Sequence, residues 1–149
     1  MANYLERKRA RFDFEILKTF EAGLELLGTE VKSLRAKKGK LEGAHVTVRG
    51  GEAYLLNCEI PPFQPQNAPK EFDATRNRRL LLSKKEIAEL AKTEETKGLA
   101  VIPLEIYPKG RYIKLRIAIA RGKKKADKRE TIKKREAERD ISRALKYRR

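Results

Sequence analysis

Residues 113–120 read Ile-Lys-Leu-Arg-Ile-Ala-Ile-Ala, and this stretch decides the fold class. Large apolar side chains occupy every second position, which is the two-residue period of a β-strand. Lys114 and Arg116 stand between them, followed by two alanines. A strand with this pattern buries one face in a core and presents a partly basic face. We therefore expect a sheet with a basic outer surface.

Shorter segments repeat the strand pattern on the N-terminal side of this stretch. Apolar and acidic side chains alternate in residues 12–16, and residues 46–57 form two alternating runs around a Gly-Gly turn. Residues 99–104 are an apolar run, and Lys-Gly at 109–110 is a plausible hairpin turn before the next strand. These segments indicate several short antiparallel strands.

Two helices are expected between the strands. Thr29 is a candidate cap for a helix that Gly39 ends. Ser83 and Glu86 have the spacing of a capping box, which opens a second helix. Gly23 stands in an apolar segment, where a glycine marks a bulge or a close backbone approach.

Together these elements predict an α+β, mostly β fold. The version we expect is a small oligonucleotide-binding-like β-barrel with two or three helices, because closing a barrel removes exposed sheet edges. Tyr107 and Tyr112 near the basic strand suit base stacking beside phosphate contacts. Composition alone does not separate this barrel from other small α+β folds.

The charge of the chain points to a polyanionic partner. The 149 residues carry a formal net charge of +16, which favours nucleic acid or an anionic membrane surface as the partner. No run approaches the length of a membrane span, and the first eleven residues contain no secretory signal, so we expect no membrane partner. The single cysteine, Cys58, suits a cytoplasmic protein and is expected to be a buried small hydrophobe.

Charge is concentrated at the C-terminal end. Residues 121–149 hold fourteen Lys and Arg and five acids, a net charge of +9 on 29 residues. We therefore predict an RNA-binding domain over residues 1–121 and a basic tail over residues 122–149. The tail has helical spacing but few apolar residues, so we expect it to be disordered when free and helical on a nucleic-acid surface.

Four sets of motifs occur in a recognisable order along the chain. They are FEAGL at 20–24, GTEVKSLR at 28–35, RLLL at 79–82 with KEI at 85–87, and GKK at 122–124 with DKR at 127–129. Together they resemble the small protein B family of transfer-messenger RNA (tmRNA) partners. The resemblance implies an oligonucleotide-binding-type barrel that binds the tRNA-like domain of tmRNA and delivers it to stalled ribosomes. It also implies that the tail enters the empty mRNA channel near the decoding centre, on the small-subunit rRNA.

The resemblance assigns roles to single residues. Family positions tied to RNA binding correspond to Glu21, Leu81 and Lys114, and the cations Lys32, Arg35 and Arg116 are further candidates. The candidate ribosome-binding residues of the tail are Lys123, Lys124, Asp127, Lys128, Arg129, Lys133 and Lys134. The chain departs from the family at three positions, which are Arg7 where Asn is usual, Phe12 where many members have His, and Ala126 where many have His or Tyr.

Each RNA-binding candidate also has a plain structural reading. Glu21 either accepts hydrogen bonds from base amino groups or a ribose 2′-OH, or is a strand-end carboxylate paired with a lysine. Lys114 either contacts phosphate or belongs to a solvated face. By residue type Leu81 suits the core better than a contact surface, and the sequence leaves open whether it contacts RNA or acts indirectly through its loop. His45, the only histidine, is expected to be structural or simply exposed.

We find no arrangement of residues typical of an enzyme. Cys/His metal spacing and a glycine-rich phosphate loop are both missing from the sequence, so we expect no catalysis, no cofactor and no metal. A tmRNA-binding rescue factor, acting as a monomer, is the favoured function. The alternative is a structural ribosomal or RNA-chaperone protein, which is also small, basic and tailed.

Overall fold

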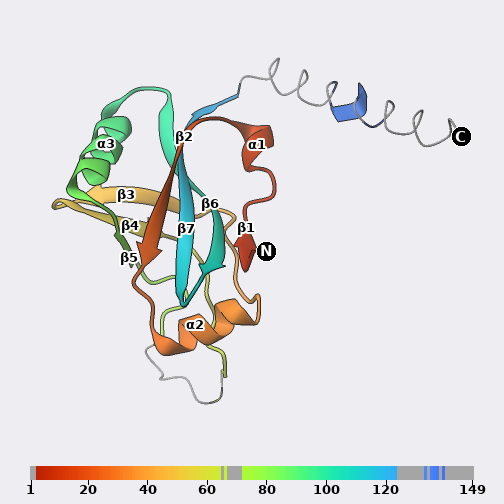
Figure 1. Ribbon diagram of the computed structural model, residues 1–149, viewed down its shortest axis with the longest axis vertical. Coiled ribbons are helices and arrows are strands. Elements are labelled where there is room, and N and C mark those ends of the chain that lie inside the picture. The colour runs from red at the N-terminus through yellow and green to blue at the C-terminus, as the bar shows by residue number, and fades with distance from the viewer. Residues whose placement is uncertain are drawn as a thin grey trace, which may run out of the picture.

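The structure is a computed structural model that describes residues 3–64, 66, 72–123, 133, 135–137 and 139 of the chain. Figure 1 shows long strands at the centre, with helices placed around them. The elements, in chain order, are β1 (Leu5–Glu6), α1 (Ala10–Asp13), β2 (Phe14–Leu24), α2 (Gly28–Arg35), β3 (His45–Arg49), β4 (Glu52–Leu56), β5 (Arg78–Leu81), α3 (Lys84–Glu95), β6 (Leu99–Lys109) and β7 (Tyr112–Gly122).

The strands of the described residues form one antiparallel sheet in the order β1-β6-β7-β2-β5-β4-β3. The sheet is strongly curled, since β3 packs against β6 although four strands separate them in the order. In Figure 1, β3 and β4 run across the direction of β2 and β7. The fold is thus mostly β with a few helices, as predicted.

The predicted closed barrel is wrong for the part of the chain that the structure describes. Closure requires hydrogen bonds between the two edge strands of a sheet. The edges here are β1 and β3, and their only strand partners among the described residues are β6 and β4. Because β1 is only two residues long, it offers few free backbone N–H and C=O groups with which another strand could pair.

The predicted strand over residues 12–16 begins two residues later than expected. Phe12 lies in α1, and β2 starts at Phe14. Ala10 of α1 is buried against Ala118 and Ala120, on the outer face of β7. This packing favours a helical turn in the segment, although the alternation of apolar and acidic side chains in residues 12–16 favours a strand.

Helix α2 begins at Gly28, so Thr29 is not its cap. The Thr29 hydroxyl instead accepts a hydrogen bond from the Phe63 backbone N–H at 3.1 Å. The helix also ends earlier than Gly39, because Lys37 has a left-handed backbone with a φ of 57°. The capping box of α3 is confirmed, with Glu86 N–H donating to the Ser83 hydroxyl at 3.2 Å and Ser83 N–H donating to the Glu86 carboxylate at 3.0 Å.

A buried ion cluster explains why GTEVKSLR folds against the sheet. Glu30 is fully buried in α2, and its carboxylate accepts hydrogen bonds from Arg78 Nε at 2.9 Å and Arg76 Nη2 at 2.6 Å. Burial raises the pKa of Glu30, but the hydrogen bonds from Arg76 and from the Leu27 N–H, with the charge of Arg78, outweigh it and lower the pKa. Ser33 in the same motif donates its hydroxyl proton to the Pro61 carbonyl. Polar contacts therefore fasten α2 to two distant loops.

The two faces of β7 meet different surroundings, as the alternation predicts. Leu115, Ile117 and Ile119 are buried in the main core. On the other face, Ala118 and Ala120 are buried under α1 in a smaller cluster. Arg116 lies on the same face as these alanines, but α1 does not cover it, and it is exposed. The outer face is therefore covered at one end of β7 and accessible at the other.

The hairpin turns and Gly23 follow the sequence prediction. Gly50, Gly51 and Gly110 all have positive φ, and they connect β3 to β4 and β6 to β7. Gly23 marks a close approach, since a Cβ at this position would lie 3.1 Å from the Cβ of Leu81. The irregularity in the pairing of β2 lies instead between Ile16 and Lys18.

Cys58 and His45 also match their predicted surroundings. Cys58 is fully buried in the main core, and burial raises the pKa of its thiol to about 11. His45 is exposed at the start of β3. The Cys58 thiol therefore lacks the environment of a reactive group.

Candidate RNA-binding surface

The exposed end of the β2-β7-β6 face brings charged side chains of three neighbouring strands into register. Glu21 of β2 lies opposite Arg116 of β7, and Arg116 lies opposite Glu105 of β6. Two residues further along each strand, Gly23 lies opposite Lys114, and Lys114 lies opposite Tyr107. These residues share one outer face because side chains alternate along each strand.

Glu21 is bound by two residues of β6, on the far side of β7. The Tyr107 hydroxyl donates a hydrogen bond to Glu21 Oε2, and Lys109 Nζ lies 2.8 Å from Glu21 Oε1. The hydrogen bonds from Lys109 and Tyr107 lower the pKa of Glu21, so the group is an anion near neutral pH. The carboxylate thus holds an aromatic ring and an ammonium group beside each other on the outer face.

Arg116 completes a second set of contacts around the same tyrosine. Its guanidinium group lies 5.0 Å from the centre of the Tyr107 ring and 2.8 Å from Glu105 Oε1. Burial and the hydrogen bond to Glu21 raise the pKa of Tyr107, so its hydroxyl stays protonated. Glu21, Tyr107, Arg116 and Glu105 therefore form one continuous polar network across three strands.

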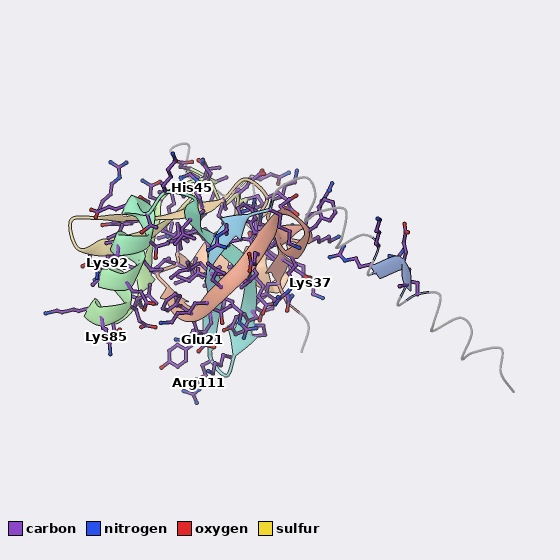
Figure 2. All side chains as sticks on the ribbon, turned by 90° about the horizontal axis from the view of Figure 1, so that it is seen from above. Glu21, Lys37, His45, Lys85, Lys92 and Arg111 are labelled. Carbon is purple, nitrogen blue, oxygen red and sulfur yellow. The ribbon has the colours of Figure 1, made fainter. Side chains whose placement is uncertain are left out.

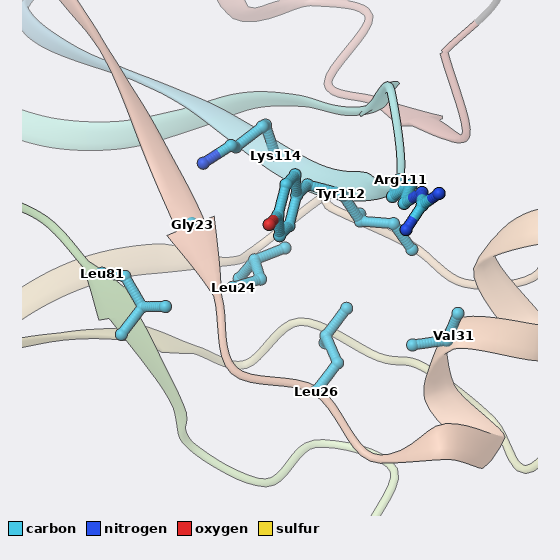
Figure 3. A pocket seen from close by; sticks show the side chains of 9 residues that line it. Gly23, Leu24, Leu26, Val31, Leu81, Arg111, Tyr112 and Lys114 are labelled. Carbon is cyan, nitrogen blue, oxygen red and sulfur yellow. The ribbon is translucent and has the colours of Figure 1, made fainter.

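Leu81 and Lys114 line a hollow next to this network. The hollow has a volume of about 280 Å³ and lies between β2, β5, β7 and α2 (Figure 3). Leu81 is 51% exposed, so the expectation that it belongs to the core is wrong. Its place on β5 directly beside Gly23 turns the side chain outward.

The six RNA-binding candidates of the folded part do not all lie on this face. Glu21, Leu81, Lys114 and Arg116 come together at the exposed end of the sheet. Lys32 and Arg35 lie on α2, whose Val31 lines the hollow. Figure 2 shows further charge spread widely, with Lys85 and Lys92 on α3 at one end and Lys37 at the other.

Only two of the tail candidates belong to the described residues. The Lys123 N–H donates to the Asp13 carbonyl at 3.0 Å, so regular pairing continues one residue past β7. Lys133 is exposed and has α-helical backbone. The other tail candidates lie outside the described residues, and they are Lys124, Asp127, Lys128, Arg129 and Lys134.

Sequence reasoning missed several members of the surface. Lys109 and Glu105 were not singled out, although the strand period places both on the same face of β6 as Tyr107. Arg111, in the hairpin between β6 and β7, lines the hollow and had no sequence signal. Their partners lie on other strands, which a local pattern does not reveal.

Two features of the described residues concern other functions. Within these residues, no group of three or more His, Cys, Asp or Glu side chains is placed to hold a metal ion. Likewise, none of the helices that the structure describes has the length and apolarity needed to span a membrane.

Comparison with known proteins identifies the family. The sequence model of the SmpB protein family matches residues 4–147. The SsrA-binding protein of Microcystis aeruginosa is 48% identical over 141 residues, covering 95% of this chain and 92% of that protein. That of Thermosynechococcus vestitus is 46% identical over 143 residues, covering 96% and 94%.

A solved structure agrees with the sequence relatives. It is described as "tmRNA-SmpB: a journey to the center of the bacterial ribosome", and one of its chains is 44% identical with a TM-score of 0.67. The similarity covers 85% of this chain and 92% of the other. The family match, the relatives and the fold agree over most of the sequence. The chain therefore belongs to the SmpB protein family.

Proposed function

We propose that this protein binds the tRNA-like domain of tmRNA and delivers it to stalled ribosomes in trans-translation. The observation that carries the proposal is the convergence of Glu21, Leu81, Lys114 and Arg116 on one accessible face, in a chain of the SmpB family. The similar proteins are named SsrA-binding proteins, and the solved structure concerns tmRNA, SmpB and the ribosome.

The chemistry of the face suits RNA. Lys114 and Arg116 provide charge for phosphates, and Tyr107 and Tyr112 provide rings for bases or riboses. The curled sheet would present this face as oligonucleotide-binding-type folds present theirs, although its two edges are not joined among the strands that the structure describes. SmpB is a family of RNA-binding factors and not of enzymes, so no reaction is assigned to the chain. The role implies action in the cytoplasm.

We further propose that the basic tail works on the ribosome and not on the tRNA-like domain. The tail would enter the empty mRNA channel near the decoding centre, where rRNA phosphates neutralise its charge. The high net charge of residues 121–149 and the helical backbone at residues 133, 135–137 and 139 support this division of labour.

A competition experiment tests RNA selectivity. Purified full-length protein is mixed at nanomolar concentration with labelled tRNA-like domain, and unlabelled tRNA is added in excess. The expected result is a complex that excess tRNA displaces only weakly. Equal displacement by tRNA would contradict the proposal and restore the structural ribosomal or RNA-chaperone alternative.

A further inference from the structure

The two edges of the sheet differ in how much free backbone they offer. The edge strands among the described residues are β1 and β3, and β1 is only two residues long. β3 has five residues and pairs with β4 on one side. Because hydrogen-bonding groups alternate between the two sides of an antiparallel strand, every second residue of β3 directs its N–H and C=O away from β4. A free edge of this length is a template to which another strand can add.

The register of the β3-β4 hairpin identifies these outward backbone groups. Arg49 and Glu52 lie opposite each other and flank a two-residue turn. The pair that flanks such a turn exchanges hydrogen bonds, so Val48 and Val46 direct their N–H and C=O groups to the outer edge. The contact of Val48 agrees with this register. Its N–H donates to Glu94 Oε1 of α3 at 2.8 Å, on the side away from β4.

Helix α3 covers this edge of the sheet. The helix contacts both β3 and β6, and Figure 1 shows it beside β3. Leu90 is fully buried and Ile87 packs against the main core, so one face of α3 is anchored. Glu94 lies in the last turn of α3, where the helix dipole favours cations over anions. Helix stability therefore does not explain this acid, whereas the hydrogen bond to Val48 gives it a role on β3.

A further strand at this edge would have to displace the Glu94 carboxylate. The strand would need the Val48 N–H that Glu94 occupies, and it would move an ionised group out of water. Burying a charge without a partner is costly. If the strand were β3 of a second copy, each copy would contribute one such carboxylate to the same contact. Soluble proteins commonly protect edge strands with charged side chains in this way.

We infer that Glu94 guards the edge of β3 against pairing with the β3 strand of a second copy of this chain. Without the guard, two antiparallel β3 strands would present the same residues to each other and form a closed two-fold dimer. The guard is separate from RNA binding, because Glu94 bonds to β3, whereas the candidate RNA-binding surface lies on β2, β6 and β7.

The test separates the hydrogen bond of Glu94 from its charge. Glu94→Ala removes both, and Glu94→Lys removes the acceptor but keeps a charged group at the edge. Glu95→Ala is the matched control, since Glu95 is the neighbouring exposed acid of the same helical turn. Full-length proteins free of nucleic acid are compared by analytical ultracentrifugation over a range of concentrations. Hydrogen exchange followed by NMR reports on the Val48 amide, and thermal melting verifies folding.

The expected result is a dimer of Glu94→Ala alone. Its Val48 amide should exchange about tenfold faster than in the wild type at low concentration, the loss expected for one hydrogen bond to a charged group. Glu94→Lys should show the faster exchange but stay monomeric, because its charge still opposes strand pairing. Adding Val48→Pro to Glu94→Ala should restore the monomer, since proline lacks the N–H that a second strand needs. Glu95→Ala should behave as the wild type does.

Three results would overturn the inference. Glu94→Ala that is monomeric at every concentration would show that the edge needs no guard. A dimer that persists with Val48→Pro would show that the copies associate through another surface. An unchanged exchange rate of the Val48 amide in Glu94→Ala would show that the carboxylate does not protect the edge. None of these results changes the selectivity for the tRNA-like domain, so the proposed function is tested separately.

Discussion

At Glu21, an acidic side chain stands on a surface beside cations that are suited to phosphate. Its carboxylate accepts hydrogen bonds from Tyr107 and Lys109, both of which come from a strand two positions away in the sheet. The geometry therefore favours the paired-carboxylate reading that the sequence left open. In this reading Glu21 serves RNA binding by holding the ring and the ammonium group in place.

A double-mutant cycle tests this positioning role. Removing an anion from an RNA-binding face should tighten binding if only net charge matters. We expect Glu21→Gln to weaken binding of the tRNA-like domain by about fivefold, the equivalent of one hydrogen bond, with no loss for unrelated RNA. Tyr107→Phe should have a similar effect, and the double variant should lose no more than either single variant. Fluorescence titration at constant salt measures all four proteins.

Two outcomes would count against this reading of Glu21. Additive losses in the double variant would indicate that Glu21 contacts RNA directly. A gain in affinity for both the tRNA-like domain and unrelated RNA would show that Glu21 affects binding only through its negative charge. Glu25→Gln is a suitable control, since Glu25 is an exposed acid after β2 that does not contact Tyr107.

Lys114 offers a separate prediction based on salt. If its ammonium group contacts one phosphate, Lys114→Gln should reduce the slope of log affinity against log salt by about 0.7 to 0.9. Leu81→Ala should lower affinity without changing that slope, because no charge is removed. Titrations across a series of salt concentrations distinguish the two. An unchanged slope for Lys114→Gln would place Lys114 in the solvated face instead.

At the scale of elements, a buried ion cluster holds α2 against the sheet. Arg78 is fully buried and donates to the Glu30 carboxylate and to the carbonyls of Cys58, Arg76 and Ala74. These bonds join α2 to the segments on both sides of the loop before β5. The same helix supplies one wall of the hollow, so its position affects the candidate site.

Glu30→Gln should therefore destabilise the protein strongly. Removing one partner of a buried ion pair leaves the other charge uncompensated, which costs about 3–5 kcal/mol of the free energy of unfolding. Chemical denaturation measures the loss, and Glu52→Gln, which breaks only an exposed pair with Arg79, should cost about 1 kcal/mol or less. Equal losses in the two variants would show that the cluster does not hold α2.

The Glu30 cluster also sets a direction for acid sensitivity. The fold lowers the pKa of Glu30 below its ordinary value of 4.5, so ionised Glu30 favours the folded state. This contribution is complete above pH 4.5 and is lost as the pH falls through the lowered, folded-state pKa. Wild-type stability should therefore fall more steeply in acid than that of Glu30→Gln, as denaturation midpoints across this range will show.

At the scale of the whole molecule, the sheet and the tail have separable tasks. The described sheet holds the apolar core, and the tail carries half of the net charge. A protein that ends after Lys123 keeps the backbone hydrogen bond from the Lys123 N–H to the Asp13 carbonyl. We expect it to fold normally and to bind the tRNA-like domain, but to fail in tagging peptides on stalled ribosomes. Tagging equal to that of the full-length protein would contradict the assigned role of the tail.

Proline substitutions test whether the tail works as a helix. Ile132 and Ile141 lie outside the described residues, so this remains a prediction from the sequence. Proline costs about 3 kcal/mol inside a helix and almost nothing in a disordered chain. We expect Pro at either position to preserve tmRNA affinity and to abolish tagging, with Ala at the same positions as the control. Full tagging with both prolines present would show that the tail does not need to be helical.

Local sequence patterns were sufficient for the elements whose causes are local. The strand at 113–120, the Gly-Gly and Lys-Gly hairpins and the Ser83 capping box all depend on residues within a few positions of one another. The motifs led to the correct family in the same way, because each motif is a contiguous run. Net charge likewise pointed to a polyanionic partner without reference to the fold.

Only the tertiary structure decided the remaining features, since each depends on residues far apart in the chain. The helical turn at Phe12 arises from the burial of Ala10 on β7, and the exposure of Leu81 arises from its place beside Gly23. The sheet remains unclosed among the described strands because closure depends on the two edges, which alternation along one strand cannot specify. The contacts of Glu21 with Tyr107 and Lys109 likewise depend on the register of β2, β7 and β6. The sequence therefore identified Glu21 as a candidate, and only the fold revealed its partners.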